Sequence, residues 1–281
     1  MTRIDRHRRG RLEFDVDDSG PEDGVPVVLL HGFPANRTGW RQVTPGLVAA
    51  GLRCIAPDQR GYSAGARPPG RRNYRRDWLV DDVLALLDLL EGPVHLVGHD
   101  WGGLVAWRLA QRAPERLASL TVLSTPHPSA FGDAFLQSDQ AFRSWYMAFF
   151  QLPWLPERVL AGRNLATALT GMGLPGHVAD QYAAHLREPA ALRAALDWYR
   201  ALPLPDPSSV PQVDPMITVP TTFVWGSGDD ALGRFGAERT ERFVAAPYRF
   251  VEVPENHWLP ETAPALVRDT ILDAVERTRT A

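Results

Sequence analysis

The feature that most constrains this chain is a glycine-rich turn at residues 98–103, which reads Gly-His-Asp-Trp-Gly-Gly. A short apolar run precedes the turn, and residues 104–112 follow it with helical periodicity, so the sequence predicts a strand, a sharp turn and a helix. Gly98 and Gly102 let the backbone fold tightly on either side of Asp100. The turn therefore presents an aspartate side chain at the carboxyl end of a strand.

An aspartate at the tip of this turn indicates a particular chemistry. A serine that attacked an sp³ carbon would form an ether, which water does not readily cleave, whereas a carboxylate forms an ester and divides one difficult step into two easier ones. Asp100 therefore favours an alkyl halide or an epoxide as the substrate. The alternative is a simple turn in which Asp100 caps the next helix, because aspartate is a preferred N-cap residue.

Candidates for an acid and a base follow later in the chain. Asp229 lies just beyond the β-rich run 221–225, where open α/β sheets hold their sites, and Asp230 is the neighbouring candidate. The spacing of the loop favours Asp229. The next predicted strand, residues 248–253, leads into His257, which is the candidate base. A neutral imidazole can take a proton from water, and a carboxylate behind it fixes the tautomer and stabilises the cation.

A second turn, at residues 31–34, follows the apolar strand predicted at residues 27–30. The backbone N–H groups of Phe33 and Trp101 are the expected donors of an oxyanion hole. They would stabilise the negative charge that forms when water attacks an ester carbonyl on Asp100.

Together these segments resemble the α/β-hydrolase-fold epoxide hydrolase family, whose close relatives are the haloalkane dehalogenases. The resemblance extends over nearly the whole chain and includes residues 58–63 (Asp-Gln-Arg-Gly-Tyr-Ser) and 114–116 (Pro-Glu-Arg). It implies an α/β-hydrolase fold and a covalent alkyl-enzyme ester on Asp100, formed without a cofactor. Two positions depart from the family pattern, since Asn256 stands where glycine is common and Ala35 where glutamate is frequent.

Tyr146 and Tyr199 lie in contexts that resemble the places where the family's lid carries its ring-opening tyrosine pair. An opening epoxide becomes an alkoxide and needs a proton donor, which a phenol supplies well. With Phe33 and Trp101, these tyrosines are the expected substrate-binding residues. Tyr182 is assigned to core packing.

Two alternatives remain open at this point. In a haloalkane dehalogenase, the indole of Trp101 and a second indole from Trp145, Trp154 or Trp198 would bind the halide, although Phe33 stands where many such enzymes carry a polar contact. The other alternative is a non-catalytic ligand-binding scaffold, which would not need a nucleophile, an acid, a base and two tyrosines.

Alternating apolar runs and amphipathic helices, such as residues 77–90, predict a mostly parallel, doubly wound sheet. The β-like runs stop near residue 128. We therefore expect the hydrolase core in residues 1–127 and 214–281, with an inserted helical cap over residues 128–213. The proline-rich stretch at residues 202–215 is interpreted as a stiff return linker.

Composition limits the partners. The 281 residues suffice for one catalytic domain with an inserted cap, and the 30 basic residues, all arginine, with 33 acidic residues leave a net charge of −3. Neither nucleic acid nor an anionic membrane is expected as a partner. The lack of lysine excludes Schiff-base chemistry, and no metal-ligand spacing is present. The expected partner is a small-molecule epoxide, and the sequence leaves the oligomeric state open.

Location follows from the same composition. The basic segment 3–11 precedes no apolar region, so it is interpreted as a solvated tail and not as a secretory signal. No run of 18 apolar residues predicts a membrane span. Cys54, the only cysteine, is expected to be buried in a strand and fits a reducing compartment, so the expected location is cytoplasmic.

Overall fold

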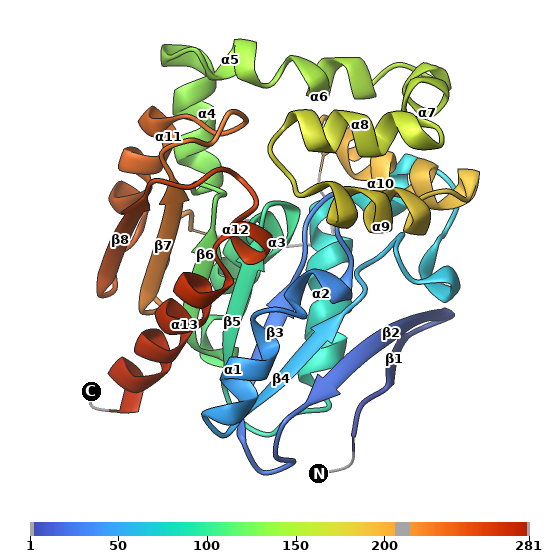
Figure 1. The fold of residues 1–281 in the computed structure, drawn as a ribbon. Coiled ribbons are helices and arrows are strands. Elements are labelled where there is room, and N and C mark those ends of the chain that lie inside the picture. The colour runs from blue at the N-terminus through green and yellow to red at the C-terminus, as the bar shows by residue number, and fades with distance from the viewer. Residues whose placement is uncertain (1–2, 206–213, 280–281) are drawn as a thin grey trace.

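The computed structural model describes residues 3–205 and 214–279, and these residues form one eight-stranded sheet with helices on both faces (Figure 1). The strands are β1 (Arg6–Arg9), β2 (Leu12–Ser19), β3 (Val25–Leu30), β4 (Leu52–Pro57), β5 (Val94–His99), β6 (Leu117–Leu123), β7 (Thr221–Gly226) and β8 (Tyr248–Val253). Their order in the sheet is β1-β2-β4-β3-β5-β6-β7-β8. The pairings of β2 with β1 and β4 are antiparallel and the others are parallel, which confirms the predicted fold class.

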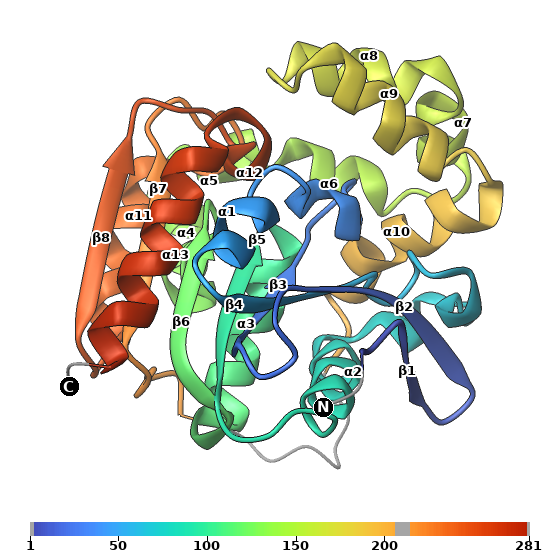
Figure 2. The same ribbon diagram turned by 60° about the horizontal axis from the view of Figure 1, so that its bottom comes forward.

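Two hydrophobic cores lie on opposite faces of the sheet. The side chains of Val28 and Leu30 enter one core, while those of Val27 and Leu29 enter the other, because successive strand residues point to opposite faces. The first core is covered by α2 (Arg76–Leu87) and α3 (Trp101–Arg112), and the second by α1 (Thr44–Ala49) and α13 (Pro264–Arg279) (Figure 2). Burial on both faces explains why the central strands are almost continuously apolar.

The described chain between β6 and β7 contains helices and no strand. These helices are α4 (Pro128–Gln137), α5 (Gln140–Arg143), α6 (Trp145–Phe150), α7 (Leu155–Leu160), α8 (Arg163–Gly171), α9 (Gly176–His185) and α10 (Pro189–Ala201). They lie above one end of the sheet in Figure 1. We call them the cap helices, although the assignment of residues 128–213 to a separate cap unit stays a prediction. Of the proline-rich stretch predicted as a return linker, residues 206–213 lie outside the described residues.

The remaining helices are short. They are α11 (Arg234–Arg239), α12 (Leu259–Thr262) and the 3₁₀ turns η1 (Arg37–Trp40), η2 (Ala64–Ala66), η3 (Arg71–Tyr74), η4 (Pro114–Arg116) and η5 (Thr240–Phe243). Among the described residues, no helix combines the length and the apolar character needed to cross a bilayer.

The prediction of a solvated arginine-rich tail is wrong. Arg6–Arg9 form the edge strand β1, and the alternating residues explain why. His7 points inward, where it is buried and stacks on Phe14 with ring centroids 4.5 Å apart. Arg6 and Arg8 point outward and both pair with Glu13.

Two predicted helix boundaries also differ from the structure. The helix expected at residues 77–90 ends at Leu87, before the turn that leads into β5. The helix expected from residue 104 begins at Trp101, because the turn that presents Asp100 passes into it without a spacer.

A residue of a buried ion pair in the core also contacts the cap. Arg60 donates two hydrogen bonds of 2.6 Å to the carboxylate of Asp82 on α2, and both side chains are buried. The carbonyl of Arg60 in turn accepts a hydrogen bond of 2.8 Å from the indole of Trp198 on α10. The helix that carries Tyr199 is therefore fixed to the core through Arg60.

The substitution Asp82→Asn should destabilise the fold, because it leaves the Arg60 guanidinium buried without a counter-charge. Loss of one partner from a buried pair costs about 3–5 kcal/mol. The matched substitution Asp88→Asn, in an exposed pair with Arg116, should cost less than about 1 kcal/mol. Urea unfolding of the three proteins measures both values, and equal losses would contradict this account.

Candidate active site

The turn after β5 holds Asp100 in a conformation that few side chains adopt. Its φ of 51° and ψ of −121° place it outside the helical and extended regions. A Cβ at Gly102 would lie 2.2 Å from the carbonyl oxygen of Leu30, and one at Gly98 would lie 2.4 Å from that of Gly102. The carbonyl of Asp100 accepts a 2.7 Å hydrogen bond from the hydroxyl of Thr125. The backbone on both sides of Asp100 is therefore fixed.

Backbone N–H groups hold one side of the Asp100 carboxylate. The N–H of Phe33, in the turn after β3, donates to Oδ1 over 2.7 Å, and the backbone N–H of Trp101 helps to lower the pKa of this carboxylate. These are the two groups that the sequence predicts as the oxyanion hole. Burial alone would raise the pKa of Asp100, but its hydrogen bond to His257 and the nearby charge lower it below the usual value.

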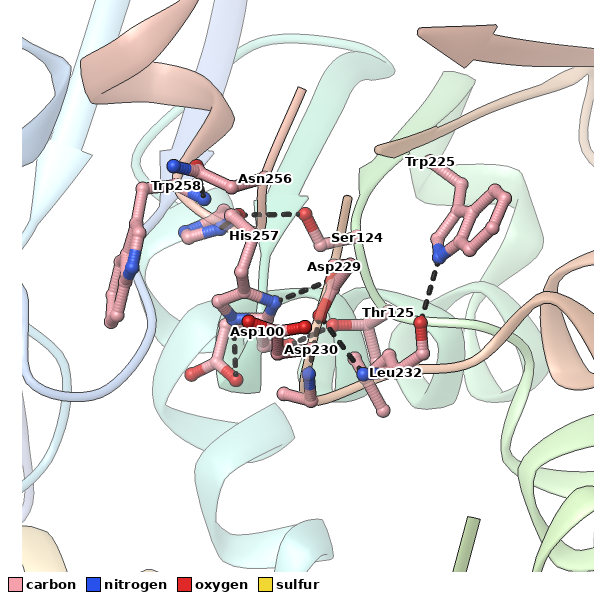
Figure 3. Close-up of polar contacts among 12 residues, drawn as sticks. Asp100, Ser124, Thr125, Trp225, Asp229, Asp230, Leu232, Asn256, His257 and Trp258 are labelled. Atoms are coloured by element: carbon pink, nitrogen blue, oxygen red, sulfur yellow. Dashed lines mark hydrogen bonds and ion pairs between the residues drawn. The ribbon is translucent and has the colours of Figure 1, made fainter. Parts of the chain in front are cut away.

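His257 lies between two carboxylates (Figure 3). Its Nδ1 is 2.7 Å from Oδ2 of Asp229, and its Nε2 is 3.5 Å from Oδ2 of Asp100. Asp230 is exposed and does not take the place of Asp229. The structure therefore brings together the three residues predicted as nucleophile, acid and base.

The loop after β7 wraps around the Asp229 carboxylate. Its Oδ1 accepts hydrogen bonds from the N–H groups of Ala231 over 2.8 Å and Leu232 over 2.9 Å, which leaves Oδ2 for His257. The indole of Trp225 holds the carbonyl of Leu232 over 2.8 Å. The orientation of Asp229 thus depends on the shape of this loop, residues 229–233, which we call the acid loop.

The backbone carbonyl of His257 is also held from two sides. It accepts hydrogen bonds from Nε2 of His99 over 2.8 Å and from the hydroxyl of Ser124 over 2.9 Å. Burial lowers the pKa of His99 to about 4, so its ring is neutral. The sequence analysis did not identify Ser124 as a site residue, although it directly follows β6 at the sheet edge where Asp100 and His257 lie.

Asn256 explains one departure from the family pattern. Its Oδ1 accepts a hydrogen bond of 2.9 Å from the N–H of Trp258, and its Nδ2 donates one of 3.1 Å to the carbonyl of Gly173 in the cap. A glycine at this position would make neither contact. The asparagine therefore ties the loop that carries His257 to the segment between α8 and α9.

The two carboxylates determine the protonation of His257. Burial lowers the pKa of the imidazole, but the charge of Asp229 and the hydrogen bonds with Asp100 and Asp229 raise it well above the usual value. The two carboxylates therefore favour the protonated form of His257, and loss of one negative charge would make the ring easier to deprotonate.

Tyr146 and Tyr199 come together from α6 and α10. Their rings meet edge to face with centroids 6.1 Å apart. Burial raises the pKa of both phenols, and the charge of Asp100 raises it further. Both hydroxyls therefore keep their protons. Tyr182 is buried in the core and donates to Glu261, outside the cavities described next.

Two cavities, one of about 420 Å³ and one of about 210 Å³, meet at Asp100, Tyr146 and Tyr199, which line both. The larger cavity also reaches His257. Its apolar walls come largely from residues that the sequence analysis did not identify, among them Phe149, Phe150, Leu169, Met172 and Trp258. A hollow of about 950 Å³ beside β2 and α1 contains none of the predicted site residues.

The tryptophans considered as halide ligands lie in different places, with Trp101 in the wall of the smaller cavity beside Asp100. The indole N–H of Trp198 is bonded to the carbonyl of Arg60. Trp154 is exposed and lines neither cavity, and Trp145 lines the larger cavity with 67% of its surface exposed. The rings of Trp101 and Tyr199 meet edge to face with centroids 4.8 Å apart.

The chain is similar to known hydrolases over most of its length. The alpha/beta hydrolase fold family matches residues 25–264. The AB hydrolase superfamily protein YfhM of Bacillus subtilis is 38% identical, over 93% of this chain and 94% of that protein. Epoxide hydrolase 4 of Homo sapiens is 34% identical, over 92% and 75%, and epoxide hydrolase A of Mycobacterium tuberculosis is 30% identical, over 90% and 91%.

Solved structures agree with these relatives. A structure described as one of the novel epoxide hydrolases from metagenomes of hot environments has a TM-score of 0.82 and 29% identity, over 98% of this chain and 99% of that one. Epoxide hydrolase A from Mycobacterium thermoresistibile has a TM-score of 0.79 and 27% identity, over 94% and 95%. The chain therefore belongs to the α/β-hydrolase fold family, and within it this enzyme is a hydrolase of the epoxide hydrolase group.

Proposed function

We propose that the enzyme opens epoxides to vicinal diols through an ester formed on Asp100. The observation that carries the proposal is the placement of Tyr146 and Tyr199 in the same cavities as Asp100. Proton donors opposite a carboxylate nucleophile suit a ring oxygen that becomes an alkoxide. The His257–Asp229 pair adjoins the same carboxylate and supplies the base that a second step requires.

In the first step, Oδ2 of Asp100 attacks an epoxide carbon, because Oδ1 is held by the N–H of Phe33. The carbon–oxygen bond of the ring breaks, and the ring oxygen takes the phenolic proton of Tyr146 or Tyr199. The products are a hydroxyalkyl ester and a tyrosinate, which solvent reprotonates. Positioned proton donation of this kind contributes roughly 10² to 10⁴ in rate.

In the second step, His257 takes a proton from water, and the resulting hydroxide attacks the ester carbonyl carbon of Asp100. The carbonyl oxygen becomes negative and is stabilised by the N–H groups of Phe33 and Trp101. The intermediate then collapses, the diol leaves, and the carboxylate is restored. One oxyanion donor is typically worth about 10² to 10³ in rate.

The first step prepares the base for the second. In the free enzyme, the negative charge of Asp100 contributes to the raised pKa of His257. Ester formation removes that charge, so the pKa of His257 falls and the ring loses its proton more readily. His257 thus becomes a base at the stage when water must be activated.

The cavities indicate the class of epoxide. Their walls are mainly aliphatic and aromatic, and Asp100 lies in the lining of both. An epoxide that presents its ring at Asp100 can place apolar substituents in both cavities. Halide release is the less suitable reaction, because the indole N–H of Trp198 already has a hydrogen-bond partner and Phe33 presents only a phenyl ring.

Purified enzyme should convert aryl or alkyl epoxides to diols and should release little bromide from short bromoalkanes. The variant Asp100→Ala should form neither product, because it has no carboxylate nucleophile. The two products are measured separately, by chromatography for the diol and by ion analysis for bromide. Bromide without diol would replace the proposal with dehalogenation, and neither product would favour a binding protein.

The double substitution Tyr146→Phe/Tyr199→Phe should slow ester formation by about 10² to 10⁴, because no phenol remains to protonate the ring oxygen. Each single substitution should cost less, since one donor is left. Rapid-mixing experiments with single turnover measure this step. The control Tyr182→Phe, outside both cavities, should keep the wild-type rate of ester formation, and an equal loss there would refute the assignment.

Acidification should cause the ester to accumulate. Asp100 stays ionised in the free enzyme because its pKa is lowered, so ester formation continues. In the ester, the charge of Asp100 no longer raises the pKa of His257, so the ring takes up a proton as the pH falls and hydrolysis declines. Acid quenching and intact-mass spectrometry between about pH 8 and about pH 5 measure the ester fraction. His257→Gln should carry the ester at every pH, and a pH-independent ester fraction in the wild type would contradict the role of His257.

A further inference from the structure

One buried side chain of a cap helix makes hydrogen bonds to the acid loop. Gln140, the first residue of α5, is 1% exposed. Its Nε2 donates a hydrogen bond of 2.7 Å to the carbonyl of Ala231, and its Oε1 accepts one of 2.9 Å from the N–H of Gly233. A single amide therefore bridges two positions of the loop that carries Asp229.

Arg143, at the other end of α5, contacts the beginning of the same loop. Its Nη1 lies 3.2 Å from the carbonyl oxygen of Asp229 and 3.4 Å from that of Asp230, and its Nε pairs with Asp139. The cap therefore makes side-chain hydrogen bonds to the backbone of four of the five residues of the acid loop. The fifth, Leu232, is held from the core by Trp225.

We infer that Gln140 is a positioning residue that sets the orientation of Asp229 toward His257 from the cap. The inference rests on the proposed function. Asp229 is oriented by the N–H groups of Ala231 and Leu232, and Gln140 fixes the peptide groups beside them. A shift of the loop would move Oδ2 of Asp229 away from Nδ1 of His257, now 2.7 Å apart.

The second N–H of the Gln140 side chain fixes the orientation of the amide group. Nε2 also donates to the hydroxyl of Ser144 over 2.9 Å, and Ser144 directly precedes α6. Both amide hydrogens and the amide oxygen thus have partners. A glutamate would be isosteric, but when ionised it would have no hydrogen to donate to the carbonyl of Ala231.

The test is Gln140→Met, which keeps the length of the side chain and removes both contacts with the loop. Ester hydrolysis should slow about tenfold to a hundredfold, since small displacements of reacting groups have effects of that size. Ester formation on Asp100 should change only a few-fold, because it does not use His257 as a base. The matched control is Gln137→Met, an exposed residue of α4 that contacts Arg239, and it should leave both steps unchanged.

A pH profile separates positioning from general support of the fold. His257 faces the carboxylates of Asp229 and Asp100, the neutral ring of His99, and the more distant Glu261. In the ester, Asp100 is uncharged, so a weaker contact with Asp229 lowers the pKa of His257. The acid limb of the hydrolysis rate should therefore move to lower pH in Gln140→Met.

Circular dichroism shows whether Gln140→Met folds. If it does not, Arg143→Met, a substitution nearer the surface, replaces it and should give the same pattern in weaker form. Equal slowing of both steps, or an unmoved acid limb, would overturn the inference. Wild-type enzyme that forms neither ester nor diol would instead refute the proposed function, so the two failures are distinguishable.

Discussion

The site depends on one sharp turn between a strand and a helix. Asp100 can stand at positive φ only because Gly98 and Gly102 leave room for the neighbouring backbone, and Gly102 lies directly against the end of β3. That contact also brings the turn after β3 close enough for Phe33 to donate to the carboxylate. The position of Asp100 and the hydrogen bond that it receives from Phe33 therefore both result from the same close packing of strand ends.

Around this turn, the enzyme uses two carboxylates in different ways. Asp229 receives backbone hydrogen bonds on one oxygen and His257 on the other, so its orientation is fixed. Asp100 lines both cavities, where a substrate can reach it. The imidazole between them responds to the charge of Asp100, and in the proposed reaction this links its basicity to the stage of catalysis.

The parts of the site that could be predicted from sequence are those attached to strand ends. Asp100, Asp229 and His257 each follow a β-like run, and parallel strands bring such positions to one edge of a sheet. The tyrosines required the family resemblance, because local pattern does not reveal which face of a cap helix meets the core. Gln140 gave no signal for the same reason. The error at Arg6–Arg9 arose because a run of charges hid an alternation with His7.

The unequal cavities have a stereochemical consequence. In the proposed reaction, an epoxide whose ring oxygen faces the tyrosines and whose carbon faces Asp100 would direct one substituent into each cavity. Its mirror image, attacked at the same carbon, exchanges the two substituents. One cavity has about 420 Å³ and the other about 210 Å³. For an epoxide with one large and one small substituent, one enantiomer should therefore fit better than the other. Chirality in the diol would thus arise from volume alone, without any hydrogen bond that recognises the stereocentre.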